Sequence, residues 1–220
     1  AEKDLGSSLL YFALFTVMLW VATQRLSYLM FSFGLFICGA LISWRIFDHI
    51  QARVSVWHDP WAFRSGSGYQ LVEAAIAMAN GGLIGTGPGN GEPNRIPEVE
   101  TDFIFAAIGE EMGLLGTVLV LSSFLLIISS GLRIAIKSSD PFNKLLALGL
   151  TTLIGLQGLV IMGGVVRLLP LTGVTLPFVS YGGSSLLANY ILVALLLRLS
   201  DQVENLELDK EKLIREASNE

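Results

Sequence analysis

Five carboxylates gather in the stretch IPEVETDFIFAAIGEE, where a long apolar segment begins. Crowded carboxylates raise one another's pKa, and a general base works best when its pKa lies near the working pH. An acid at the top of a membrane-grade segment is therefore a candidate for taking a proton from a substrate. The five acids are Glu98, Glu100, Asp102, Glu110 and Glu111.

Helix capping is a competing explanation for Asp102. Thr101 is a good N-cap residue and would place Asp102 in the first turn, near the positive end of the helix dipole. Glu110 and Glu111 lie deeper, where an unpaired charge costs about 2.5–3.5 kcal/mol. Adjacent helical residues point about 100° apart, so the two cannot share one partner. For these two we expect structural pairing rather than direct chemistry.

Arginines supply the cations that an anionic substrate would need. A guanidinium holds a carboxylate or phosphate through two parallel hydrogen bonds. Each arginine taken alone is better explained as an interface anchor whose charged end reaches into water. Together with the carboxylates and a hydroxyl-rich segment, they indicate a site for a lipid-linked phosphate. The arginines concerned are Arg53, Arg64, Arg95 and Arg167.

Several other chemistries are excluded by the motifs. The glycine cluster at 85–91 is followed by no Lys-Ser/Thr pair and has no βαβ context, so phosphate-binding and dinucleotide-binding loops do not fit. Two histidines and one cysteine show no zinc-ligand spacing. The net charge of −5 comes partly from an acidic tail, and we expect no nucleic-acid partner.

The elements that position these residues are membrane spans. The chain is 52% hydrophobic and 15% charged, against about 25% charged in soluble domains. Its uncharged runs reach the roughly 20 residues that cross a bilayer. We therefore predict an all-α integral membrane protein with about five transmembrane helices over residues 1–200, followed by a charged cytoplasmic tail over 201–220. The predicted spans are 5–24, 27–47, 103–132, 143–166 and 178–199.

Two of the segments that connect the predicted spans should contain ordered structure. The loop over 48–101 contains an Ala-rich stretch, 69–80, which predicts a half-buried helix that stops at Gly81-Gly82. The apolar segment 168–185 holds five prolines and glycines and cannot form one helix. Irregular backbone at membrane depth survives inside protein or beside a water-filled cavity, so we expect a broken, re-entrant-like segment that lines a cavity. A kinked loop between two helices is the alternative.

Charge distribution predicts the orientation. Five spans place the termini on opposite sides, and Lys and Arg concentrate in the short connections near Arg25, in 133–144 and at Arg198. The positive-inside rule then places these connections in the cytoplasm. The N-terminus, the 48–101 loop and Arg167 face outward, and the C-terminus is cytoplasmic.

The motifs, taken in order, resemble the SEDS family (shape, elongation, division and sporulation), which includes RodA, FtsW and SpoVE. The resemblance covers nearly all of residues 4–200 and corresponds to the C-terminal five of the family's ten spans. Because the chain begins with Ala1, we expect it to be a piece of a longer protein. The motifs are DPW at 59–61, GSGYQ at 66–70, GGLIG at 81–85, PEVETDFIF at 97–105, GEEMGL at 109–114 and LPLTGVTLPFVSYGGSS at 169–185.

The resemblance implies a peptidoglycan glycosyltransferase of the bacterial plasma membrane. It would polymerise lipid II during elongation or division, beside a class B penicillin-binding protein. In the family the essential acid occupies the position of Asp102, with Glu98 as a second acid. A divalent cation, Mg²⁺ or Mn²⁺, could help with the diphosphate. The implied substrate-binding residues are Arg53, Arg95, Arg167, Gln70, Ser180, Ser184 and Ser185.

Two other functions fit the same sequence. With five spans absent, the chain could be an inactive scaffold that binds a penicillin-binding protein. It could also belong to a lipid II flippase, which would need a continuous polar route across the membrane. The ionisable residues instead gather toward the outward half, with Glu110 and Glu111 the deepest, which favours the polymerase.

Overall fold

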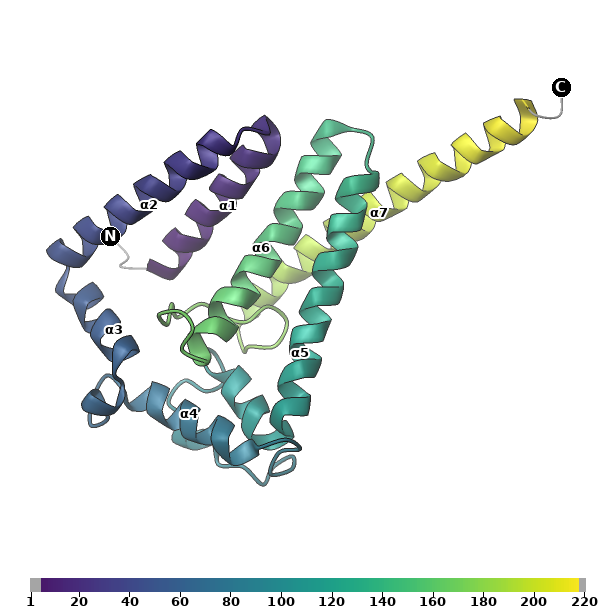
Figure 1. The fold of residues 1–220 in the computed structure, drawn as a ribbon. Helices are drawn as coiled ribbons and strands as arrows, with labels where there is room; N and C mark the ends of the chain where they lie inside the picture. The colour runs from purple at the N-terminus through teal and green to yellow at the C-terminus, as the bar shows by residue number, and fades with distance from the viewer. Residues whose placement is uncertain (1–4, 218–220) are drawn as a thin grey trace.

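The computed structural model of the protein describes residues 5–217, and the regular structure in that range is helical (Figure 1). Within it, five helices are long and apolar enough to cross a membrane. The predicted all-α membrane protein with five spans is confirmed. These helices are α1 (Leu5–Thr23), α2 (Leu26–Ile46), α5 (Ile104–Lys137), α6 (Pro141–Val165) and α7 (Gly183–Ala217).

Helices α5 and α6 form the centre of the bundle, with α1 and α7 packed against α6. The Asp140 side chain accepts a hydrogen bond from the Asn143 N–H at 2.9 Å and so caps α6, whose first residue is Pro141. A Cβ on Gly131 would lie 2.0 Å from Oγ1 of Thr151. Because Gly131 has none, α5 and α6 approach closely, as small residues allow in membrane bundles.

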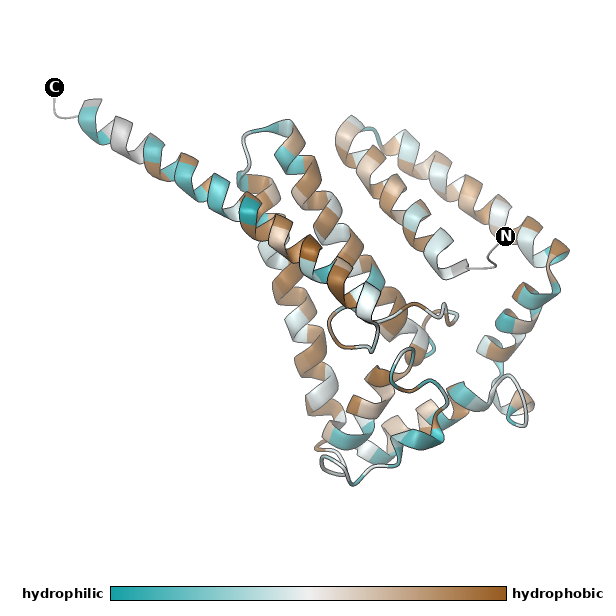
Figure 2. Cartoon of the chain, turned by 180° about the vertical axis from the view of Figure 1, so that it is seen from behind, coloured by the Kyte–Doolittle hydropathy of each residue, from teal (hydrophilic) through white to brown (hydrophobic). Residues whose placement is uncertain are grey.

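Hydrophobic residues predominate along the long helices, and hydrophilic residues collect at the loops and along the projecting part of α7 (Figure 2). Helix α2 is the most uncovered span, with only 6% of its residues buried. Phe31 and Phe33 are more than 60% exposed. Such a surface is stable where lipid or further protein surrounds it, as expected for a membrane span.

The loop over 48–101 is folded against the end of the bundle. It contains α3 (Asp48–His58), the 3₁₀ turn η1 (Trp61–Phe63), α4 (Tyr69–Gly81) and the 3₁₀ turn η2 (Pro93–Arg95). The half-buried helix predicted over 69–80 is confirmed as α4, whose Val72 and Ala74 are fully buried. Helix α3 was not predicted, because its polar sequence lacks a clear apolar face.

The start of α5 differs from the prediction. The helix begins at Ile104 with Phe103 at the N-cap position and no side-chain cap. Thr101 is therefore not the N-cap, since its hydroxyl donates to the Glu98 carbonyl at 3.2 Å within a preceding turn. The helix also kinks at Gly113, where φ is 65° and ψ is −159°.

The C-terminal region also differs in detail. The last helix starts at Gly183 rather than 178, because residues 168–182 are not helical. It then continues without interruption to Ala217, so the charged tail extends the span and is not a separate short helix. No Gly or Pro interrupts 184–217, and the Lys137 ammonium contacts the Glu207 carboxylate at 2.8 Å.

Candidate active site

A cavity of about 260 Å³ lies at the loop end of the bundle. Four segments that are far apart in the sequence line it: α3, the start of α4, the turn before α5, and the broken segment after α6. Arg53, Gln70 and Asp102 are the polar residues predicted from the sequence that meet there, with Leu171 and Gly173 opposite. We call this the Asp102 cavity.

The turn that carries Asp102 is fastened to the broken segment. The Ser180 hydroxyl donates to the Thr101 carbonyl and accepts from the Leu176 N–H, the latter at 2.8 Å. The Tyr181 N–H donates to the Glu100 carbonyl at 2.8 Å. The two residues that precede Asp102 are therefore held by a segment nearly 80 positions later in the sequence.

The environment of Asp102 raises its pKa. Burial is the largest cause, because a carboxylate loses hydration when it is enclosed. A hydrogen bond from Thr101 lowers the pKa, the nearby Glu98 charge raises it, and the Arg53 charge lowers it. The net rise brings this acid toward the range in which it can exchange a proton with a substrate.

Arg53 and Gln70 connect the helices of the loop to the walls of the cavity. Arg53 donates to the Leu171 carbonyl at 3.5 Å, and Gln70 donates to the Pro97 carbonyl at 3.4 Å. Both contacts are long, so these side chains keep donors available for a ligand. Gly173 has a φ of 71°, and a Cβ there would lie 3.6 Å from Oδ2 of Asp102. This glycine keeps the wall close to the acid without covering it.

The structure does not bring the other three candidate arginines, Arg64, Arg95 and Arg167, to the cavity. Arg167 donates to the carbonyls of Trp57 and His58 at the end of α3, and its own carbonyl accepts from the Trp57 indole. A cation at a helix C-terminus is stabilising, so Arg167 anchors α3. Arg95 is exposed and pairs with Glu92.

The three predicted serines lie at different positions in the structure. Ser180 is buried and bonded to backbone, as described above, and Ser184 is exposed. The Ser185 hydroxyl contacts that of Thr175 at 2.8 Å and accepts from Asn189. None of the three lines the Asp102 cavity. Glu98 is exposed beside it and acts on Asp102 through its charge.

Ala52, Ser67, Leu171 and Gly173 line the cavity and were not predicted as site residues. Ser67 and Gly173 belong to the quoted motifs, so the motif positions contained a signal for them. Ala52 lies in α3, a helix that is not predicted from the sequence.

Structural pairing was expected for both deeper acids, and the structure shows it for only one of them. Oε1 of Glu111 accepts from the Gly89 N–H at 3.1 Å, so its side chain is paired with the glycine loop. Glu110 is only 5% exposed, and its Oε2 has no hydrogen-bond partner. Among residues 5–217, no three His, Cys, Asp or Glu side chains gather as a metal-binding group.

These features define a multi-pass helical membrane protein with an acid-containing cavity at one end. The profile of the FtsW/RodA/SpoVE family, described as "Cell cycle protein", matches residues 1–205. The chain belongs to this family, which confirms the resemblance seen in the motifs.

Known relatives are similar over most of this chain. It is 50% identical over 199 residues to "Peptidoglycan glycosyltransferase RodA" of Mycobacterium tuberculosis (strain ATCC 25618 / H37Rv), covering 90% of this chain and 42% of that protein. It is 37% identical over 205 residues to "Probable peptidoglycan glycosyltransferase FtsW" of Geobacter metallireducens, covering 92% and 55%. The chain thus spans about half the length of these relatives.

One solved structure is also similar, from work entitled "Structural coordination of polymerization and crosslinking by a peptidoglycan synthase complex". The TM-score is 0.73 at 28% sequence identity, covering 91% of this chain and 56% of that one. The helical arrangement and the loop end are therefore those of a known fold.

Proposed function

We propose that this chain forms the acid-bearing part of a membrane glycosyltransferase that polymerises lipid II into peptidoglycan strands. The observation that carries the proposal is the Asp102 cavity, in which a carboxylate of raised pKa lies beside Arg53 and Gln70. Family membership and the names of the relatives support the reaction class. The activity belongs to the full-length protein, because this chain spans about half of its relatives.

In the proposed reaction Asp102 acts as general base. Its carboxylate takes the proton from the 4-hydroxyl of a GlcNAc at the end of one substrate. The oxygen attacks the anomeric carbon of MurNAc on the other substrate, and a new glycosidic bond forms. The bond from that carbon to the diphosphate oxygen breaks, the electron pair leaves with undecaprenyl diphosphate, and the anomeric carbon is inverted.

Arg53 is placed to bind the leaving diphosphate, because a guanidinium stabilises charge that develops on phosphate oxygens. Gln70 offers an amide to a sugar hydroxyl on the same wall. Mg²⁺ is commonly held by one or two carboxylates together with substrate phosphates. We therefore propose that a divalent cation, if the reaction uses one, enters with the diphosphate and shares the carboxylates beside Arg53.

We also propose that the loop end faces outward and works beside a class B penicillin-binding protein. The basic residues Arg133, Lys137 and Lys144 lie at the opposite end of α5 and α6, as the positive-inside rule requires of a cytoplasmic side. The similar solved structure is of a peptidoglycan synthase complex that couples polymerisation with crosslinking. A transpeptidase partner would receive the strand as it grows.

Substitution of Asp102 tests the function. In the full-length protein, Asp102→Asn should lower lipid II polymerisation by roughly 10²–10⁴-fold, the usual contribution of a general base. Asp140→Asn is the matched control, because it removes a carboxylate at the far end and Asn is an equally good N-cap. Unchanged polymer yield from Asp102→Asn would remove Asp102 from this role. No polymer from the unsubstituted protein would favour the scaffold or the flippase.

A further inference from the structure

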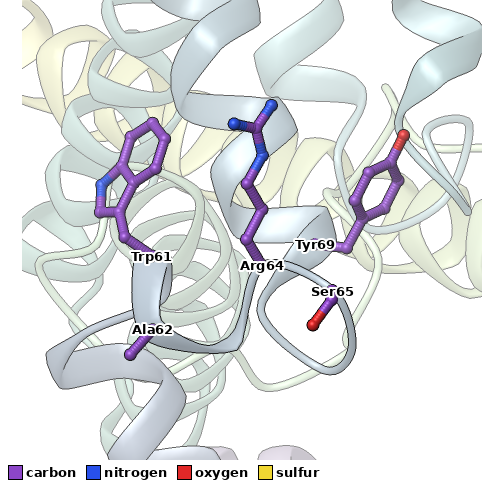
Figure 3. Close-up of a pocket in the computed structure, with 5 residues that line it drawn as sticks. All are labelled: Trp61, Ala62, Arg64, Ser65 and Tyr69. Atoms are coloured by element: carbon purple, nitrogen blue, oxygen red, sulfur yellow. The ribbon is translucent and has the colours of Figure 1, made fainter.

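A shallow, open pocket lies on the loop that joins α3 to α4, and five residues line it (Figure 3). Its volume is about 590 Å³. We call it the Trp61 pocket. Trp61 and Tyr69 stand on either side of Arg64 in the view, and the three side chains extend in the same direction. The lining residues are Trp61, Ala62, Arg64, Ser65 and Tyr69.

The aromatic rings of this pocket are open to a ligand. Trp61 is 52% exposed and Tyr69 is 38% exposed, although both belong to a folded loop end. The loop is well ordered by backbone hydrogen bonds, including those of Gly66 and Gly68 to the Phe63 carbonyl, each at 3.0 Å. The backbone that carries the rings is therefore ordered, and both rings are accessible for stacking on the flat apolar face of a ligand.

Arg64 supplies a charge that is already oriented. Its guanidinium lies 5.9 Å from the Trp61 ring centre, and one nitrogen lies 3.5 Å from Oε1 of Glu73. The Glu73 side chain is 10% exposed and holds the guanidinium from below, while the Arg64 side chain remains 56% exposed. A guanidinium has five N–H donors, so most remain available for a carboxylate on the ligand.

One loop separates the two cavities. Arg64, Ser65 and Tyr69 line the Trp61 pocket, whereas Ser67 and Gln70 line the Asp102 cavity. Residues of one short loop therefore line both pockets. A molecule that occupies the Asp102 cavity and is longer than it can continue into the Trp61 pocket.

Size supports such a continuation. Ligand sites commonly measure about 300–1,000 Å³, and the Asp102 cavity, at about 260 Å³, falls below that range. The Trp61 pocket, at about 590 Å³, falls within it. A polymer of sugars that reacts at Asp102 would therefore need further binding surface, which the adjacent pocket offers.

We propose that the Trp61 pocket binds a carboxylate-bearing glycan, namely the sugar strand that extends from the Asp102 cavity. The inference rests on the proposed function and adds a binding site to it. Trp61 and Tyr69 stack on the apolar faces of the sugar rings, and Arg64 pairs with a carboxylate on the strand. Holding the strand there keeps it bound between successive additions.

A lipid headgroup is the competing occupant, because Trp, Tyr and Arg are all frequent at membrane interfaces. Trp61 and Tyr69 offer two exposed rings on either side of Arg64, which suits a strand of several sugars, whereas a single phosphate would need only the guanidinium. The loop that also lines the Asp102 cavity ties this pocket to the strand rather than to bulk lipid.

The test uses the full-length protein purified in detergent. Binding of uncrosslinked, soluble glycan strands with free peptide carboxylates is measured by calorimetry for the unsubstituted protein, Trp61→Ala and Arg64→Gln. Each substitution should weaken binding by roughly tenfold, the usual cost of losing an aromatic or arginine anchor. Trp61→Phe should restore most of the affinity, because it keeps a ring. Trp44→Ala and Arg45→Gln are matched controls, both exposed on α2.

Two readouts separate this inference from the proposed function. Polymerisation should continue in Trp61→Ala and Arg64→Gln, with shorter strands, whereas Asp102→Asn should stop it. Glycan affinity and strand length that match the unsubstituted protein would overturn the inference while leaving the function intact. Weaker binding to phosphatidylglycerol vesicles, with glycan binding unchanged, would assign the pocket to lipid instead. Equal Tm values confirm that the variants are folded.

Discussion

At the scale of single residues, two charges act on Asp102 in opposite directions. Glu98 raises its pKa and Arg53 lowers it. A general base must be deprotonated, so activity should rise with pH through the pKa of Asp102. Glu98→Gln removes the like charge and should move this rise to lower pH, whereas Arg53→Gln should move it to higher pH.

The measurement is the polymerisation rate of the full-length variants between about pH 4 and pH 8. Glu92→Gln is the control, because it removes an exposed carboxylate that pairs with Arg95 outside the cavity. Its pH profile should match that of the unsubstituted protein. Shifts in the same direction for Glu98→Gln and Arg53→Gln would contradict the electrostatic account of Asp102.

The sequence predicts which residues form the site better than it predicts which groups each residue contacts. Asp102, Arg53 and Gln70 were predicted as site residues, and the structure brings them together. Arg167 was predicted to bind substrate but instead holds the end of α3. An arginine suits a phosphate and a helix C-terminus equally well, so only the fold distinguishes the two uses.

At the scale of elements, the segment 168–182 positions the turn before α5. Ser180 does this with one hydroxyl, which joins the Leu176 N–H to the Thr101 carbonyl. Ser180→Ala leaves both groups without this partner, at a cost of roughly 1–3 kcal/mol for buried groups. The turn would then hold Asp102 less firmly in its enclosed position, and because burial is the main cause of its raised pKa, the pKa of Asp102 should fall.

We therefore expect Ser180→Ala to lower kcat more than it changes KM, and to move the acid limb of the pH profile to lower pH. Ser180→Thr keeps the hydroxyl and should restore the position of the limb. Ser123→Ala, which removes a hydroxyl bonded within α5, is the matched control. If Ser180→Ala lowers the yield of folded protein but does not shift the acid limb of the pH profile, Ser180 has a structural role only.

The kink in α5 depends on one glycine. Gly113 has a φ of 65° and a ψ of −159°, a region essentially restricted to glycine. A Cβ there would lie 2.4 Å from the backbone nitrogen of Gly85. Gly113→Ala should therefore destabilise the protein by at least about 1–3 kcal/mol. Gly39→Ala, at an open position of α2, should leave the Tm in detergent unchanged. If Gly113→Ala and Gly39→Ala both have the Tm of the unsubstituted protein, the kink at Gly113 is refuted.

The sequence could predict that α5 exists but not that it bends. Its apolar run is long enough to cross a bilayer, and a lone glycine inside a helical pattern is usually tolerated. The reason for the bend lies in another segment. The N–H groups of Leu114 and Leu115 donate to the carbonyls of Gly82 and Leu83, and the carbonyls of Glu110 and Glu111 accept from Thr86 and Gly87. Such pairing between loop and helix has no local sequence signal.

At the scale of the whole molecule, the two ends of the bundle differ in the charges that they carry. The acid-bearing cavity and the folded loop lie at one end, and Arg25, Arg133, Lys144 and Arg198 lie at or beyond the other end of the spans. The apolar face of α2 is also uncovered. Lipid or further protein must therefore surround this part of the bundle. Both features follow from the sequence, because length and charge of apolar runs need no tertiary information.

Cysteine labelling tests the orientation. The chain has one cysteine, Cys38, which is exposed on α2, so Cys38→Ser provides a background without reactive thiols in this chain. Asn90→Cys in the loop and Asn205→Cys on the projecting part of α7 then place single probes at exposed positions of the two ends. With the full-length protein in intact cells, an impermeant maleimide should label Asn90→Cys at once and label Asn205→Cys only after the membrane is opened. The reverse pattern would turn the cavity toward the cytoplasm, where a strand made at Asp102 would be released on the wrong side of the membrane for the cell wall.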